Sequence, residues 1–175
     1  MSIAPTLTAP PVPSGSSHVN ILSAASGEVK VKVSSGNSIE GKNVLDGSTE
    51  TCWTSDNLPP NSDPSSAHYT LSFKLAAPVK LDRLHSISVT FAGGFSPISL
   101  TLLGSQDGKT WQDVGKDGVE VWVKDANAKQ YFDLHNAVKG EEGREVRWLR
   151  FDMKGSADDY GRVTIYQVEI FALQS

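Results

Sequence analysis

The segment "GSQDGKTWQDV", Gly104–Val114, places an Asp-Gly pair between two short stretches with strand-like character. Asp107-Gly108 in this setting is a strong local signal for a β-hairpin, because both residue types tolerate the positive φ angles of tight turns. Trp111 begins the returning strand, where its ring can cover the turn without any ligand. The segment therefore predicts a tight hairpin within a β-domain and a structural role for Trp111.

The same segment looks similar to the Asp-box of sialidases, S-x-D-x-G-x-T-W, but three features exclude that assignment. Asp107 is followed directly by Gly108, so the spacing is one residue short. The motif occurs once, whereas a propeller repeats its motif from blade to blade. A chain of 175 residues is also too short for a multi-bladed propeller and a tail. A glycan-cleaving propeller is therefore excluded.

Segments of alternating apolar and polar residues lie on both sides of the hairpin, separated by clusters of Gly, Pro, Asp and Ser. They span residues 29–33, 68–73, 86–91, 98–103, 119–123 and 147–153, and residues 162–173 are apolar on both faces like a central strand. Helical periodicity is nearly absent, apart from one possible helical turn at residues 38–47. Many short strands at this spacing predict an all-β fold, a jelly-roll β-sandwich of about eight strands.

Several motifs share a family resemblance that covers residues 21–173. The hairpin, "NVLDGSTETCW" (43–53), and the closing segments "VRWLRFDM" and "GRVTIYQVEIFAL" resemble the discoidin, or coagulation-factor C-type, domains of the galactose-binding-like superfamily and the related carbohydrate-binding modules. Within that superfamily, "ETCWTSD", "FAGGFSP" and "YGRVTIYQVEIF" look most like the nuclear receptor-associated proteins of discoidin fold, a small intracellular branch. The resemblance implies a jelly roll used for binding, without catalysis.

The composition limits the classes of binding partner and the cellular compartment that we expect. The chain has 16 basic and 20 acidic residues, net charge −4, and no basic run, which disfavours nucleic-acid binding. No apolar run approaches the roughly 20 residues of a membrane span, and the N-terminal segment lacks the pattern of a signal peptide. The single cysteine, Cys52, excludes an internal disulfide, whereas extracellular discoidin domains tie their ends with one. We therefore expect an intracellular protein of the nucleus or cytoplasm, with Cys52 as a small buried residue beside Trp53.

The first 17 residues differ in composition from the rest of the chain. They carry no charged side chain and contain four of the nine prolines, with several serines. A segment of this kind buries too little apolar surface to order itself. The sequence predicts a flexible Pro/Ser-rich tail over residues 1–17 and a β-sandwich domain over residues 18–175.

The segment "NVLDGSTET" (43–51) is a candidate calcium site. Ca²⁺ takes six to eight oxygen ligands from carboxylates, hydroxyls, amides and backbone carbonyls. The candidate ligands of this structural metal are Asn43, Asp46, Ser48, Thr51 and, from the last strand, Glu169. In calcium-binding relatives the position of Ser48 is often Asp, so this chain lacks one charge. The alternative is that Asp46 and Thr51 cap the loop by bonding backbone N–H groups.

The resemblance also implies a ligand site on the loops at one end of the sandwich, here residues 54–68, 92–97 and 155–162. Those loops contain the candidate binding residues Asp56, Asn57, His68, Phe95, Asp158, Asp159, Tyr160 and Arg162. An exposed aromatic ring near an arginine and acidic groups suits a protein motif or a sugar. The alternatives are solvated loops with Phe95 tucked inward and Arg162 paired with Asp158 or Asp159. Trp53 suits the core better than a ligand platform.

No catalytic constellation occurs in the sequence. The four histidines have no Cys or Asp partner at motif spacing, and the nucleophile-elbow, zinc-protease and P-loop motifs are absent. We therefore expect a non-catalytic intracellular binding module, a protein–protein adaptor with a regulatory role, rather than an enzyme such as an orphan hydrolase. The alternative function is a lectin-like carbohydrate-binding protein of the discoidin type. The oligomeric state and the identity of the partner stay open.

Overall fold

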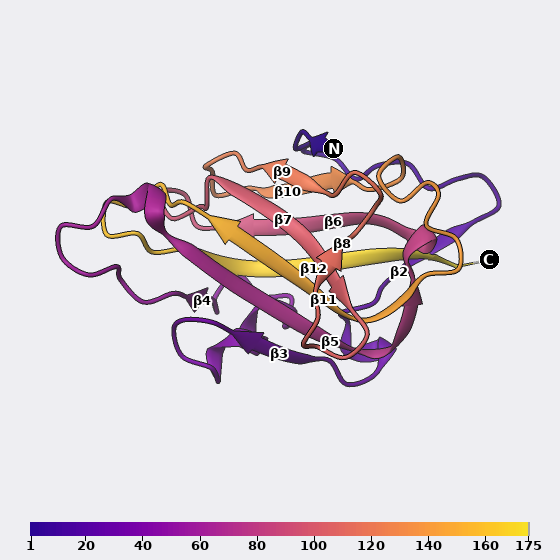
Figure 1. Ribbon diagram of the computed structural model, residues 1–175, viewed down its shortest axis with the longest axis horizontal. Coiled ribbons are helices and arrows are strands. Elements are labelled where there is room, and N and C mark those ends of the chain that lie inside the picture. Colours follow the sequence, from indigo (N-terminus) through magenta and orange to yellow (C-terminus); the bar gives the residue numbers. More distant parts are fainter. Residues whose placement is uncertain (175) are drawn as a thin grey trace.

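Two β-sheets pack face to face in the computed structural model, which describes residues 1–174 (Figure 1). The seven-stranded sheet contains β1 (Ser2–Ile3), β3 (Lys30–Val33), β5 (His68–Lys80), β7 (Ser99–Ser105), β8 (Gln112–Asp113), β9 (Glu120–Trp122) and β11 (Glu145–Lys154). The five-stranded sheet contains β2 (Ser17–Asn20), β4 (Trp53–Thr54), β6 (Leu84–Phe91), β10 (Lys129–Asp133) and β12 (Thr164–Gln174). The 3₁₀-helices are η1 (Ala24–Ser26), η2 (Glu40–Leu45), η3 (Pro64–Ser66) and η4 (Leu81–Arg83).

The order of the strands mixes segments that are distant in the sequence. The seven-stranded sheet runs β1-β9-β7-β11-β5-β3 with β8 beside β7, and the five-stranded sheet runs β10-β6-β12-β2 with β4 beside β12. The predicted jelly-roll β-sandwich is thus confirmed, and the predicted helical turn corresponds to η2. The described strands number twelve rather than about eight, and three of them, β1, β4 and β8, have only two residues.

The strand β10 was not predicted, because a polar residue occupies one of its core-facing positions. Gln130 and Phe132 of "KQYFD" are both buried. The Gln130 side chain accepts a hydrogen bond from the Lys124 backbone N–H at 3.0 Å and donates to the Lys124 carbonyl at 2.5 Å. A buried amide satisfied in this way costs little, so the polar residue is compatible with the core.

The core lies between the sheets and follows the predicted alternation. Leu71 and Phe73 of β5, Phe151 of β11 and Ile87 of β6 are fully buried and belong to one hydrophobic core. The rings of Phe73 and Phe151 meet edge to face with centroids 5.5 Å apart. Ile98 was expected on the inner face, but it precedes the first residue of β7 and is 47% exposed. The period-2 pattern therefore holds inside the strands and fails at their ends.

The predicted flexible tail makes specific contacts with the sandwich. β1 pairs in parallel with β9, and Thr6 forms a two-way backbone bridge with Tyr131 of β10 at 2.9 Å. The Pro11 carbonyl lies 2.9 Å from Nε2 of the buried His85. The segment therefore covers edge strands of both sheets. The unpaired N–H and C=O groups of an edge strand can form hydrogen bonds with the backbone of another segment, whatever side chains that segment carries. This association therefore needs no charged or apolar side chains.

The predicted strand reversal at Asp107-Gly108 is present, but the turn is longer than a two-residue hairpin. Gly104 lies opposite Gln112, and the six residues 106–111 separate the last residue of β7 from the first of β8. The Asp107 carboxylate accepts hydrogen bonds from the backbone N–H groups of Thr110 at 2.9 Å and Lys109 at 2.8 Å. These bonds, with one from Ser105, lower the pKa of Asp107 to about 2. The side chain of Asp107 therefore organises this turn, in which only Gly108 has a positive φ, 76°.

Within residues 1–174, no helix has the length and apolar character needed to cross a bilayer.

Candidate functional site

Three connections meet at one end of the sandwich, on the left of Figure 1: residues 55–67 between β4 and β5, 92–98 between β6 and β7, and 155–163 between β11 and β12. Backbone hydrogen bonds join them. The Leu58 N–H donates to the Tyr160 carbonyl at 2.9 Å, and the Ala157 N–H donates to the Ser96 carbonyl at 2.9 Å. The structure thus brings together the three loops that the sequence assigned to one face. We call this surface the loop end.

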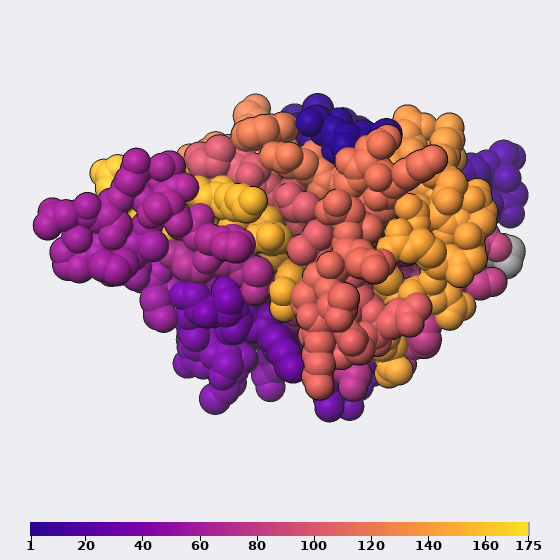
Figure 2. Space-filling view, viewed as in Figure 1, coloured from indigo at the N-terminus to yellow at the C-terminus, as the bar shows by residue number. Residues whose placement is uncertain are grey.

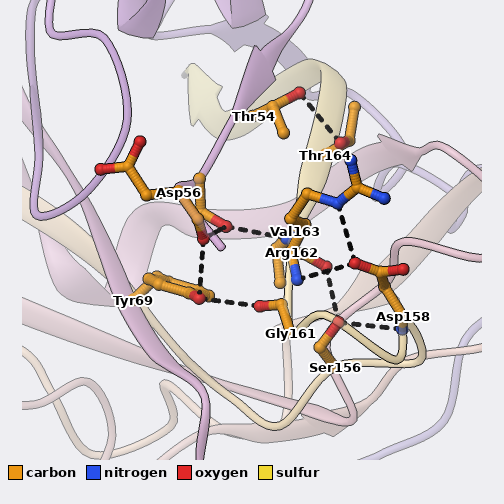
Figure 3. Close-up of polar contacts among 10 residues, drawn as sticks. Thr54, Asp56, Tyr69, Ser156, Asp158, Gly161, Arg162, Val163 and Thr164 are labelled. Atoms are coloured by element: carbon orange, nitrogen blue, oxygen red, sulfur yellow. Dashed lines mark hydrogen bonds and ion pairs between the residues drawn. The ribbon is translucent and has the colours of Figure 1, made fainter. Parts of the chain in front are cut away.

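Buried hydroxyl groups fix the base of the loop end (Figure 3). The Tyr69 hydroxyl donates to the Gly161 carbonyl at 2.7 Å and lies 3.2 Å from the Asp56 carbonyl. The Ser55 hydroxyl accepts from the Val163 N–H at 2.9 Å. These bonds tie the first loop to the third. In the sequence Tyr69 is an apolar position of the alternating segment 68–73, and no local pattern indicates a carbonyl partner 92 residues away.

The third loop is closed by an acidic residue and a serine. The Asp158 carboxylate accepts hydrogen bonds from the Arg162 backbone N–H at 3.1 Å and from its Nε at 2.9 Å. The Ser156 hydroxyl donates to the Arg162 carbonyl at 2.5 Å and accepts from the Asp158 N–H at 3.0 Å (Figure 3). The ion pair anticipated as the alternative role of Arg162 is therefore present. It gives the guanidinium one fixed position.

Opposing effects set the charge states of this pair. Burial by itself raises the pKa of Asp158, but the hydrogen bonds from the side chain and backbone of Arg162, together with its charge, outweigh burial and lower the pKa overall. The hydrogen bond to Asp158 raises the pKa of Arg162, against a smaller effect of burial. Both residues are therefore charged at neutral pH, and each charge stabilises the other.

Aromatic rings surround the fixed guanidinium. The Arg162 Cζ atom lies 5.1 Å from the centroid of the Phe95 ring and 5.6 Å from that of Tyr160. Tyr160 is 65% exposed, whereas Phe95 is half-buried below the loops. Asn57 and Asp159 are exposed beside them. The loop end thus presents an exposed aromatic ring, a fixed cation and several polar side chains.

Two of the predicted loop residues point elsewhere. His68 is the first residue of β5, and its Nε2 contacts the Asp152 carboxylate of β11, so His68 lies on the sheet and not on the loop. The Asp56 carboxylate accepts from the Gly36 N–H at 3.3 Å, on the connection that follows β3. The assignment of His68 to the loop is therefore corrected. Residue 68 belonged both to the predicted alternating segment 68–73 and to the predicted loop 54–68, and the structure places it in the strand.

Three residues of the predicted calcium loop form a self-contained turn. The Asp46 carboxylate accepts from the Ser48 N–H at 2.9 Å and from the Thr51 hydroxyl. The Asn43 side chain donates to the Cys52 carbonyl at 3.0 Å. These are loop-capping contacts of the kind expected under the alternative interpretation, except that Thr51 bonds the carboxylate rather than a backbone N–H. Both oxygens of Asp46 already have partners from the protein.

The fifth predicted ligand does not join this turn. The Glu169 carboxylate contacts Lys129 and accepts from the Ser88 hydroxyl at 2.8 Å across β6. Within residues 1–174, no group of three or more His, Cys, Asp or Glu side chains has the arrangement of a metal site. Glu169 is thus separate from Asp46, Ser48 and Thr51, and the six to eight oxygens that Ca²⁺ needs would have to come without it. Calcium binding here stays a prediction, which a titration at millimolar Ca²⁺ with thermal unfolding as readout would test.

The tryptophan beside this loop belongs to the core. Trp53 is fully buried, and its Nε1 donates to the Ser35 carbonyl at 3.1 Å. Cys52 is half-buried rather than buried, and its Sγ lies 3.8 Å from the Thr54 hydroxyl. Trp53 therefore has no surface to offer a ligand.

Comparisons with known proteins agree with this architecture. The F5/8 type C domain family matches residues 23–168. The Nuclear receptor 2C2-associated protein of Homo sapiens is 30% identical over 129 residues, which cover 74% of this chain and 77% of that protein. The CBM32-5 module of Clostridium perfringens, solved with GalNAc-β-1,3-galactose, has a TM-score of 0.58 at 12% identity, covering 82% and 95% of the two chains. A chitosan-binding module of a Paenibacillus chitosanase/glucanase has a TM-score of 0.62 at 14% identity, covering 89% and 100%. The two solved structures share the fold alone.

Proposed function

The chain belongs to the F5/8 type C domain family, and from this premise we propose that it is a non-catalytic binding module whose loop end recognises a protein partner. One observation carries the proposal. The exposed Tyr160 ring lies beside the guanidinium of Arg162, which Asp158 holds in place. Tyrosine and arginine dominate the energetics of protein interfaces, and a side chain that is already ordered loses less entropy on binding.

Most polar groups at the base of the loop end are hydrogen-bonded within the fold, which favours a protein over a sugar as the ligand. A sugar site needs several hydrogen-bonding groups that are free to meet ring hydroxyls. At the loop end, Asp158 and Arg162 are bonded to each other, and the hydroxyls of Tyr69, Ser55 and Ser156 are bonded within the fold. Asn57 and Asp159 remain exposed, and the ring of Tyr160 is the principal exposed apolar group, which suits an apolar pocket on a protein surface.

A regulatory adaptor role in the nucleus or cytoplasm is part of the proposal. The name of the human relative describes association with nuclear receptor 2C2, which supports a protein-binding role for this chain as well. Cys52, the single cysteine, is a free thiol, which suits a reducing compartment.

The absence of catalysis is proposed from the geometry of the best candidate for a catalytic pair. His68 and Asp152 are in contact, as a base and its orienting carboxylate would be. They lie on the outer face of a sheet, and no hydroxyl or thiol within residues 1–174 is hydrogen-bonded to His68. Without a nucleophile, the pair is a polar contact on a strand surface.

Affinity purification from the native cell tests the proposal when wild type is compared with Tyr160→Ala. The control is Trp122→Ala, which removes an aromatic ring that is 53% exposed on β9, outside the loop end. We expect wild type and the control to recover the same specific protein and Tyr160→Ala to lose it. Equal recovery by all three would show that the loop end is not the recognition surface.

Glycan binding is the second candidate function, because one matched structure is a carbohydrate-binding module solved with a galactose-containing ligand and shares this fold. An aromatic ring beside an arginine also suits stacking on a sugar face. A glycan array separates the two functions. A signal that free galactose competes away and Tyr160→Ala abolishes would establish the lectin. Silence on the array, with a specific co-purifying protein, supports the adaptor.

A further inference from the structure

The outer face of the seven-stranded sheet carries basic side chains in two neighbouring rows. In the first row Lys30 of β3 lies opposite Lys74 of β5, and Lys74 lies opposite Trp148 of β11. In the second row Lys32 lies opposite Ser72, and Ser72 lies opposite Arg150. We call Lys30, Lys32, Lys74 and Arg150 the basic rows. They place four cations on three adjacent strands.

Two tryptophan rings lie beneath three of these four cations. The Nζ atoms of Lys32 and Lys74 lie 5.1 and 5.9 Å from the centroid of the Trp148 ring, and the Arg150 Cζ atom lies 3.8 Å from that of Trp111. The two indole rings meet edge to face at 6.3 Å. Trp111 comes from the connection between β7 and β8, shown in salmon on the near face in Figure 2. The cations therefore have preferred positions on a shared aromatic support.

No carboxylate within residues 1–174 lies at ion-pair distance from the basic rows. The close contacts between basic and acidic side chains in that part of the chain are His68–Asp152, Lys129–Glu169, Glu141–Arg144 and Asp158–Arg162. Arg150 instead donates to the Ser72 hydroxyl at 2.7 Å. Burial lowers the pKa of Arg150, only partly opposed by the charge of Asp152.

The pairing of Lys30 with Lys74 also has a cost, because like charges directly opposite each other destabilise a sheet. A bound anion would remove that repulsion.

The dimensions of the basic rows suit a short ligand. Neighbouring strands lie about 4.8 Å apart, so β3 to β11 spans about 10 Å, and rows two residues apart are separated by about 7 Å. An extended peptide rises about 3.3 Å per residue, so three or four residues cover this area. A surface groove beside the first row is lined by Lys30, Lys74 and Arg147, and also by Glu28. It adds one cation and one carboxylate next to the basic rows.

We propose that the basic rows bind an acidic segment of a partner protein, through a surface separate from the loop end. A long polyanion such as nucleic acid fits less well for two reasons. The chain has a net charge of −4, and acidic side chains flank the rows, with Asp152 on β11 and Asp113 on β8. A short run of Glu or Asp meets the four cations without reaching those flanks, and its carboxylates supply the missing partners of Lys32, Lys74 and Arg150.

Fluorescence anisotropy with a labelled octaglutamate peptide tests this proposal on the full chain at low and physiological salt. The test variant is the triple change Lys30→Gln, Lys32→Gln and Lys74→Gln, which alters exposed or half-exposed side chains and leaves the stack of Arg150 on Trp111 intact. The matched control changes three exposed lysines elsewhere, Lys116→Gln, Lys124→Gln and Lys139→Gln, with the same loss of charge. Circular dichroism verifies that both variants fold.

We expect wild type and the control triple to bind octaglutamate, the test triple to bind it about tenfold more weakly or not at all, and added salt to weaken binding. An octaglutamine peptide should not bind. Equal loss in both triples, or no binding of octaglutamate by wild type, would refute the proposal. Tighter binding of an octathymidylate oligonucleotide through the same lysines would show that the basic rows bind nucleic acid and not an acidic peptide segment. Tyr160→Ala should leave octaglutamate binding unchanged, so failure here is distinct from failure of the loop-end proposal.

Discussion

Arg162 and Arg150 both lie over aromatic rings, but among residues 1–174 only Arg162 has a carboxylate at ion-pair distance. Its Nε donates to Asp158 at 2.9 Å, and this bond raises its pKa. Arg150 donates to the hydroxyl of Ser72, and burial lowers its pKa. At the loop end the positive charge is neutralised internally, and the exposed ring is left for contact. On the sheet face the charge is unpaired, so that surface is suited to an anion.

The largest expected effect comes from a substitution at Gly108 that disturbs the Trp148 ring, which supports Lys32 and Lys74. This glycine has a φ of 76°, and a Cβ atom there would lie 2.7 Å from the Trp148 ring. Backbone strain and the clash together predict that Gly108→Ala lowers the free energy of unfolding by about 3 kcal/mol. Denaturant unfolding measures it. Gly140→Ala is the control, because its φ is 87° and the site is open, and it should cost only about 1 kcal/mol.

Equal losses in the two alanine variants would show that Trp148 moves aside freely. In that case the aromatic floor of the basic rows is adaptable rather than fixed. A larger loss in Gly108→Ala, accompanied by weaker octaglutamate binding, would tie the turn to the binding surface.

A smaller effect is expected at the other arginine, from Asp158→Asn. The substitution removes the charge that accepts two hydrogen bonds from Arg162, and we expect a loss of about 1.5 kcal/mol in the free energy of unfolding after solvent screening. Asp159→Asn is the matched control, since the neighbouring carboxylate is exposed. It should stay within about 0.5 kcal/mol of wild type. Equal effects of the two substitutions would mean that the pair with Arg162 does not stabilise the loop.

The same pair predicts a pH dependence with a defined sign. The pKa of Asp158 is lower in the folded state than the value of about 4 that an unfolded chain gives. Its contribution to stability is therefore complete above about pH 4 and is lost as the pH falls through the folded pKa. The difference in unfolding free energy between wild type and Asp158→Asn should shrink below about pH 4. A constant difference down to pH 2 would contradict the assignment.

Sequence predicted the fold because the signals that set it are local. The alternation of apolar and polar residues in segments such as 68–73 and 86–91 places the apolar residues on one face of a strand. Every β-sandwich buries one face of its strands, so this pattern is expected whatever the strand order. The two-residue strands β1, β4 and β8 left no such pattern, because pairing of this length depends on the neighbouring backbone. The contacts of residues 1–17 were missed for the same reason.

The site was only partly predictable. The three loops could be grouped by family resemblance, and Tyr160 and Arg162 are close in the sequence. The hydroxyl of Tyr69 could not be assigned, because its acceptor is a carbonyl brought near by the fold. Trp148 and Arg150 are two residues apart and must share a face of β11, but the opposition of Lys30 and Lys74 depends on strand register, which no local pattern determines.

The smallest expected effect is the coupling between each arginine and its ring. Double-mutant cycles should give about 1 kcal/mol for Arg150 with Trp111, where the guanidinium lies 3.8 Å from the ring centroid and is partly buried. For Arg162 with Tyr160 the separation is 5.6 Å and the ring is 65% exposed, so the coupling should be too small to resolve. A larger coupling at Arg162 would reverse the comparison, because the loop-end ring would then be part of the folded structure rather than free for a partner. Alanine substitutions at the four positions, with unfolding free energy as the readout, decide between these outcomes.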